Sequence, residues 1–175
     1  MDWINREVDR IRNDNAAKYQ AQQKQEAINA HAWEMWERLR NLIEEAVKEL
    51  NASPEMRQRS GAVELNGHNV QILRLENPVI PSVYITITYG HDGLCVERKR
   101  RLEPLGIFDS YTDNLDYDLD QNGRVVLRGE QGQLLNAERA VEYILKPLVR
   151  KHDDLEFSFP SIPLVSDIEE LADVN

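Results

Sequence analysis

Apolar residues recur every three or four positions in the first third of the chain, and this spacing predicts a long helix. No Gly or Pro occurs between Met1 and Ser53. The recurring apolar positions are Ile28, Ala32, Met35, Leu39, Leu42 and Ala46, and they are flanked by Trp36, Ile43, Val47 and Leu50. An apolar stripe of this width is typical of a helix that packs on a core. We therefore expect one helix, or two abutting helices, over residues 2–51.

The first half of this helix has a different pattern. Ile4, Val8 and Ile11 form a short apolar stripe, whereas residues 13–26 are polar on nearly every side. A helix that is polar all round crosses solvent, pairs with another chain or frays. We therefore expect residues 1–27 to be a polar helical extension, through which the chain could form a homodimer.

The period of the apolar pattern changes from 3.6 to 2 after Pro54, and this change predicts strands. Residues 51–60 are expected to form a linker. Beyond the linker, the Asn-Gly pair at residues 66–67 is a hairpin turn signal that would pair Val63 with Val70.

The clearest strand is residues 83–89, VYITITY, in which apolar and polar side chains alternate. Alternation places Tyr84 and Tyr89 on opposite faces of this strand. The turn at residues 90–93 returns the chain as a second strand over residues 94–101. The predicted cross-strand neighbours are Tyr89 with Leu94, Ile87 with Val96 and Tyr84 with Lys99.

Residues 116–130, DYDLDQNGRVVLRGE, have two interpretations. The first, third, fifth and sixth positions of a calcium-binding loop are matched by Asp118, Asp120, Asn122 and Gly123. The twelfth position, however, is Gly129 where such a loop needs Glu. A hairpin that turns at residues 121–123 explains more of the sequence, and it pairs Asp116 with Arg128, Tyr117 with Leu127, Leu119 with Val125 and Asp120 with Arg124. We therefore expect a hairpin without a metal site, and its register assigns no partner to Asp118.

A second helix is expected over residues 137–149, with Asn136 as its N-cap and Pro147 kinking or shortening it. The predicted fold is therefore α+β: a long N-terminal helix, an antiparallel meander of five to six strands, and a C-terminal helix packed on one sheet face. The same pattern predicts a single domain over residues 28–151, followed by an acidic, partly apolar tail over residues 152–175.

The net charge of the 175-residue chain is −10, and the charge is unevenly distributed. Residues 152–175 contain seven acids and no Lys or Arg. Nucleic acid is not an expected partner, because non-specific binding to it needs a basic field. A membrane is not expected either, since no apolar run approaches about 18 residues and the first ten residues lack the apolar core of a signal peptide. Because Cys95 is the only cysteine, we expect no disulfide and a cytoplasmic location.

Residues 98–101, RKRR, form the densest basic cluster in the sequence. Alternation sends Arg98 and Arg100 to one side of the strand and the other two basic residues to the opposite side. The cluster either discourages edge-to-edge pairing of the strand, or contacts the acidic tail or an acidic partner.

Signals for catalysis are weak. His91 and Cys95 are close in sequence, but a histidine in a turn and a cysteine in mid-strand, with no oxyanion-hole signal, indicate structural roles. The sequence contains none of the glycine-rich nucleotide loops, the serine-hydrolase elbow or the zinc-protease motif. We therefore expect no catalytic residue, no metal and no cofactor.

Two function classes remain. The first is a non-enzymatic protein-interaction module, such as an adaptor or a small chaperone, whose partner is another protein or a second copy. Its expected contact residues are Trp33, Trp36, Arg98, Arg100, Phe157 and Phe159. The two tryptophans also suit a core position. The alternative is a small-ligand or enzymatic pocket between sheet and helices, lined by Tyr84, Tyr89 and Phe108 with Trp33.

Overall fold

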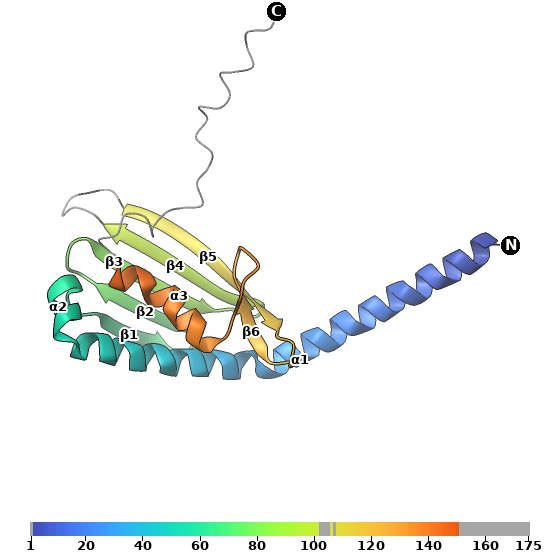
Figure 1. Cartoon of the computed structure of the whole chain (residues 1–175), viewed down its shortest axis with the longest axis horizontal. Coiled ribbons are helices and arrows are strands. Elements are labelled where there is room, and N and C mark those ends of the chain that lie inside the picture. Colours follow the sequence, from blue (N-terminus) through green and yellow to red (C-terminus); the bar gives the residue numbers. More distant parts are fainter. Residues whose placement is uncertain (1, 102–105, 107, 151–175) are drawn as a thin grey trace, which may run out of the picture.

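One helix, α1, runs without a break from Asp2 to Ala52 (Figure 1). The structure, a computed structural model, describes residues 2–101, 106 and 108–150. The other two helices are α2 (Pro54–Ser60) and α3 (Ala137–Val149). The strands are β1 (Glu64–Asn69), β2 (Ile72–Asn77), β3 (Ser82–Tyr89), β4 (Gly93–Arg101), β5 (Phe108–Leu119), β6 (Val125–Arg128) and β7 (Leu134–Leu135).

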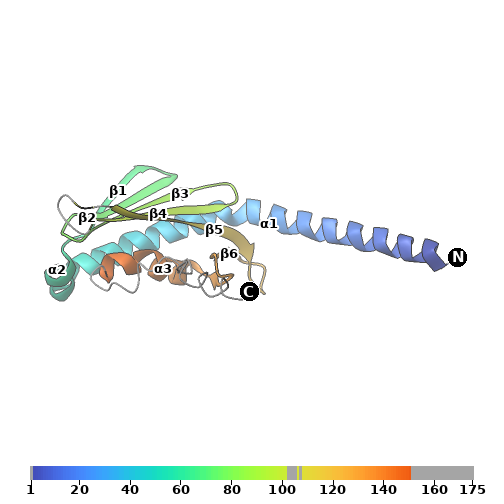
Figure 2. The same cartoon turned by 90° about the horizontal axis from the view of Figure 1, so that it is seen from above.

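These strands form one antiparallel sheet in the order β1 to β7. Each strand pairs with the next one along the chain, so the sheet is a meander. Both long helices, α1 and α3, lie on the same face of the sheet (Figure 2). The expected α+β class and the order of helix, meander and helix are confirmed. The described sheet has seven strands where the sequence predicted five to six.

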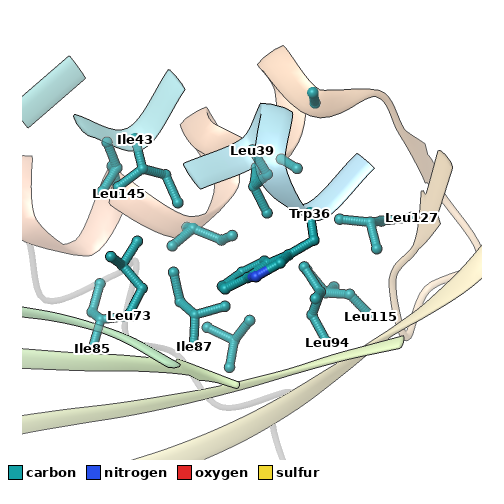
Figure 3. Close-up of a cluster of buried hydrophobic side chains, with 14 of the residues drawn as sticks. Trp36, Leu39, Ile43, Leu73, Ile85, Ile87, Leu94, Leu115, Leu127 and Leu145 are labelled. Carbon is teal, nitrogen blue, oxygen red and sulfur yellow. The ribbon is translucent and has the colours of Figure 1, made fainter. Parts of the chain in front are cut away.

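The core lies between this sheet face and the two helices (Figure 3). Trp36, Leu39 and Ile43 of α1 are completely buried. The large side chains that are buried with them are Leu73, Leu75, Ile85, Ile87, Leu94, Leu115, Leu127 and Ile144. The buried face of α1, from Ile28 to Val47, follows the apolar stripe read from the sequence. Burial of this stripe is the main stabilising term for the helix, because apolar area contributes about 25 cal/mol per Å² removed from water.

The prediction of a linker over residues 51–60 is wrong. α1 ends at Ala52, and α2 begins two residues later with Pro54 in its first turn. The Ser53 side chain caps α2 by accepting a hydrogen bond from the backbone N–H of Met56, at 3.3 Å. Proline ends one helix because its ring clashes with the preceding turn, yet its fixed φ suits the first position of the next.

The predicted turn at residues 66–67 is also wrong. Both residues lie within β1, and the chain turns at residues 70–71. The register of β1 and β2 shifts between Asn66 and Asn69, which accommodates one extra residue of β1 as an irregularity in the ladder. The hairpin therefore pairs Leu65 with Leu75, and Val63 has no strand partner at Val70.

The other two hairpins have the predicted registers. Across β3 and β4, Ile87 pairs with Val96 and Tyr84 with Lys99. Across β5 and β6 the ladder contains three of the four predicted pairs: Asp116 with Arg128, Tyr117 with Leu127 and Leu119 with Val125. The fourth, Asp120 with Arg124, lies beyond the ladder, where the Asp120 N–H donates to the Arg124 carbonyl oxygen at 2.8 Å. Gly123 has φ 72°, as its turn position requires. The Asn136 side chain caps α3 by accepting from the Arg139 N–H at 2.9 Å, also as predicted, and α3 continues past Pro147 to Val149.

Candidate functional site

Trp33 and Trp36 of α1 have different environments. Trp36 is completely buried, and its Nε1–H donates a 2.7 Å hydrogen bond to the carbonyl oxygen of Val70. Trp33 is 37% exposed and meets the Tyr89 ring edge-on, with 5.2 Å between the ring centroids. Tyr89 also lies 6.2 Å from the Tyr117 ring. Of these two residues, Trp36 is therefore a core residue, and Trp33 is the one that presents an aromatic surface to a partner.

The three expected pocket residues do not come together. Tyr84 points to the sheet face opposite α1, whereas Tyr89 packs on the tryptophans of α1. Phe108 begins β5, but its side chain lies outside the described residues. The expected contact residues Phe157 and Phe159 also lie outside the described residues. The inner face near Tyr89 is filled by aromatic side chains.

Arg98 and Arg100 share the inner face of the sheet, the side that alternation gave them, and both are buried, with exposures of 5% and 7%. Arg98 Nη1 lies 3.7 Å from Asp113 Oδ2, and its guanidinium lies 5.0 Å from the centroid of the Tyr143 ring. Arg100 Nη2 lies 3.3 Å from Asp109 Oδ2. Burial and pairing within the domain make both arginines poor contact residues for an external partner, because a buried charge is stable only when paired.

Tyr143 of α3 completes this polar cluster by donating its hydroxyl proton to Asp113 Oδ2. Burial, and then the hydrogen bond to Asp113, raise the pKa of Tyr143 to about 12. The hydroxyl therefore remains protonated at neutral pH and acts as a donor to the buried carboxylate. The cluster joins α3 to β4 and β5 through Asp113, which contacts both Tyr143 and Arg98. Asp113 Oδ1 and Arg98 Nε make no hydrogen bond within the part of the chain that the structure describes.

The most exposed feature of the structure is the first half of α1. We call Asp2–Glu26 the N-terminal arm; every side chain in it is exposed. Figure 1 shows the arm projecting beyond the sheet. Its large apolar side chains and their exposures are Trp3 68%, Ile4 42%, Val8 40%, Ile11 48% and Tyr19 63%. Ile4, Val8 and Ile11 follow a spacing of four and three, so they line one face of the helix.

Contacts within the arm include ion pairs between neighbouring turns. Arg10 lies 2.5 Å from Glu7 and 3.4 Å from Asp14, and Arg12 lies 3.8 Å from Asp9. Exposed pairs of this kind contribute little, because solvent and salt screen them. None of these contacts covers the apolar stripe.

The base of the arm is held by a buried carboxylate. Asp118 of β5 is 6% exposed and forms ion pairs with Lys24 of the arm and with Arg128 of β6. The Leu119 N–H also donates to Asp118 Oδ1, at 2.8 Å. The predicted register assigned no partner to Asp118 and placed Asp116 opposite Arg128. Asp116 and Arg128 are indeed paired in the ladder, but the Arg128 side chain contacts Asp118, its diagonal neighbour. Nothing in the sequence pattern linked Lys24 to this strand.

The calcium interpretation of this hairpin has no support from the geometry. The Asp120 carboxylate accepts the backbone N–H groups of Arg124 and Asn122, at 2.9 and 2.8 Å. The hydrogen bond from Arg124 is the main reason that the pKa of Asp120 is lowered. Among the described residues, no group of three or more His, Cys, Asp or Glu side chains could hold a metal ion.

A groove with a volume of about 500 Å³ lies between the three helices. Its apolar lining consists of Ala46, Leu50, Met56, Val141, Leu145 and Val149. The described residues that line the groove all belong to helices, apart from the cap residues Ser53 and Arg150. The groove is therefore not the pocket between sheet and helices that the sequence suggested.

No family model matches this chain, and neither the curated proteins nor the solved structures include a significantly similar protein. In the described part of the chain, no helix has the length and apolar content needed to cross a bilayer. Function must therefore be inferred from the geometry itself.

Proposed function

We propose that this protein is a non-enzymatic protein-interaction module, adaptor-like or chaperone-like, and that the N-terminal arm is its contact surface. The observation that supports this proposal is a run of exposed helical residues, Asp2–Glu26, that has an apolar stripe on one face. Exposed apolar side chains arranged along one helix face are the form in which helices bind protein grooves and other helices.

The physical argument concerns the stability of the arm. In water, most helical stability in proteins comes from packing an apolar face, and isolated helices are marginal. The apolar stripe of the arm packs on none of the described residues, so the arm lacks this source of stability within its own domain. A partner that covers Ile4, Val8 and Ile11 would supply the missing packing. The Lys24–Asp118 contact supports the proposal because it holds the base of the arm against the sheet.

A cytoplasmic setting remains part of this proposal, and it rests on the single cysteine, Cys95, which is exposed. A small-ligand function is the second candidate. The observation in its favour is the apolar groove between the helices. It receives less support, because Tyr84 and Tyr89 are on opposite sheet faces.

The test uses the full chain with Ile4→Asp, Val8→Asp and Ile11→Asp combined. The matched control adds the same three negative charges on the opposite face of the arm, as Asn13→Asp, Ala17→Asp and Gln20→Asp. Light scattering after size exclusion gives the molar mass, and hydrogen exchange reports protection of the arm. We expect the wild-type chain and the control to form an assembly, with itself or with a copurifying protein, and the stripe variant to be a single chain with an unprotected arm.

The proposal is overturned if the wild-type chain is monomeric, without bound protein, and its arm amides exchange as fast as those of the stripe variant. Native mass spectrometry of that monomer then decides the second candidate, since a retained small molecule would favour a ligand function.

A further inference from the structure

We propose that the partner of the N-terminal arm is a second copy of this chain, and that the two arms pair side by side, parallel and in register. This inference rests on the proposed function of the arm and names its partner. Figure 1 shows α1 along one long edge of the domain, with α3 and the rest of the sheet to the same side of it. A second α1 can therefore approach from the open side.

The stripe has the spacing of a short coiled coil. With Ile4 at position d, the heptad places Val8 at a, Ile11 at d and Asn15 at a. In a parallel, in-register pair, each of these residues meets its own copy. Val8 and the two isoleucines then form three apolar layers, which would cover the exposed stripe completely. A lone Asn at an a position is the established device for fixing register and two-stranded assembly.

The charges that flank the stripe select the parallel orientation. Glu7 is at position g and Arg12 is at the following e position. In a parallel pair, g of one helix lies next to the following e of the other, so Glu7 meets Arg12 of the second copy on both sides. In an antiparallel pair that buries the same stripe, the g positions of the two helices face each other, which places Glu7 near Asp14 of the second copy. Like charges at these edges disfavour that arrangement.

The seam has a defined end. Lys18 takes the next d position, and Gln22 and Gln25 follow at a and d. A lysine facing its own copy at d opposes close packing, so the tight contact ends near Asn15. Beyond it the helices separate, and each α1 turns its apolar stripe into its own core from Ile28.

Charge exchange in the full chain tests the orientation. Glu7→Arg and Arg12→Glu, made separately, should each raise the dissociation constant of the dimer roughly tenfold, because both symmetry-related contacts become repulsive. The double variant, which exchanges the two charges, restores the contacts between the helices and should bind more tightly than either single variant, although it loses the Glu7–Arg10 and Arg12–Asp9 pairs within each helix. Arg6→Glu, at the outward-facing position f, is the control and should leave the dimer unchanged. Stronger association of Glu7→Arg alone would indicate antiparallel pairing and overturn the inference.

A cysteine cross-link tests the register. In a Cys95→Ser chain, Val8→Cys should form a disulfide-linked dimer on mild oxidation, because the two copies of position 8 face each other. Asn13→Cys, at the outward position f, is the control and should remain unlinked. A dimer in solution that fails to cross-link through position 8 overturns the proposed register. A chain that binds a different protein through the same stripe, and not itself, also overturns this inference, but it leaves the proposed function intact.

Discussion

At the scale of single residues, Arg98 shows what alternation can and cannot predict. Alternation correctly placed Arg98 and Arg100 on the same side of β4. It could not indicate that the two arginines are buried at this end of β4, because Arg98 contacts Asp113 on the neighbouring strand and Tyr143 on α3. A run of four basic residues therefore suggested a charged strand end, whereas half of its charge is neutralised inside the domain.

The raised pKa of Tyr143 gives a prediction for alkaline pH. Tyr143 titrates near its ordinary value of 10.0 in the unfolded chain and at about 12 in the folded protein. Below pH 10 both states are protonated, so its contribution to stability is constant. Above pH 10 the unfolded state loses its proton first, and the contribution of Tyr143 to the free energy of unfolding should fall by about 1 kcal/mol by pH 11.

Urea denaturation at pH 9 and pH 11 measures this change, with Tyr143→Phe as the comparison. The phenylalanine variant should be less stable at pH 9 by about 1–3 kcal/mol, because the buried Asp113 loses its donor. It should also lose less stability than the wild type between the two pH values. Equal losses in the two chains would contradict the assignment of this titration to Tyr143.

At the scale of elements, hairpins were predictable where local turn chemistry and strand pattern agreed. The β5–β6 register followed from the position of Gly123 and from the alternating charges. The β1–β2 hairpin had an equally good turn signal, yet the chain turns later. At the observed turn, the Val70 carbonyl accepts hydrogen bonds from Trp36 and from Arg40, at 2.7 and 3.1 Å. These contacts come from α1, so a local pattern could not reveal them.

The start of β4 gives a second prediction. A Cβ on residue 93 would collide with the carbonyl oxygen of Leu115 and lie 2.8 Å from Asp116 Cα, both on the backbone of β5. Backbone in a central strand cannot yield as a flexible side chain can, so Gly93→Ala should lower the free energy of unfolding by more than about 2 kcal/mol.

Gly123→Ala is the matched comparison for Gly93→Ala. A Cβ at residue 123 meets nothing within 4 Å, but φ there is +72°. Its cost should be only about 1 kcal/mol, the strain of a left-handed alanine. Thermal or urea unfolding separates the two cases, and similar losses would show that strand packing around Gly93 can adjust.

At the scale of the whole molecule, the layered fold could be predicted from the sequence, whereas the contact that holds the base of the arm could not. The apolar stripe of α1 and the alternation of the strands determine which faces meet, and both are local patterns. The Lys24–Asp118 ion pair could not be predicted from such patterns. Lys24 is not distinguished by any pattern in the helix, and the predicted register gave Asp118 no cross-strand partner. The groove depends on how three helices pack, which no single segment encodes.

The ion pair at the base of the arm gives a prediction at this scale. Asp118→Asn removes the charge that faces Lys24 and Arg128 but keeps an oxygen for the Leu119 N–H. Because both cations are almost half exposed, the loss of stability should be modest, about 1–2 kcal/mol. Hydrogen exchange should increase over residues 20–27. Asp116→Asn, an exposed neighbour, should change neither measurement, and an unchanged exchange rate in Asp118→Asn would show that the arm does not depend on this contact.

The continuity of α1 has a mechanical consequence. A helix without Gly or Pro between its exposed arm and Trp36 has no built-in hinge. From Asn15 to Ala27 it forms a stiff rod of roughly 20 Å, at about 1.5 Å per residue. A flexible linker would let two joined domains sample a wide range of separations, whereas a rigid helix fixes both the distance and the direction between them. The helical rise would then set the distance between the sheet and any partner bound at the N-terminal end of the arm.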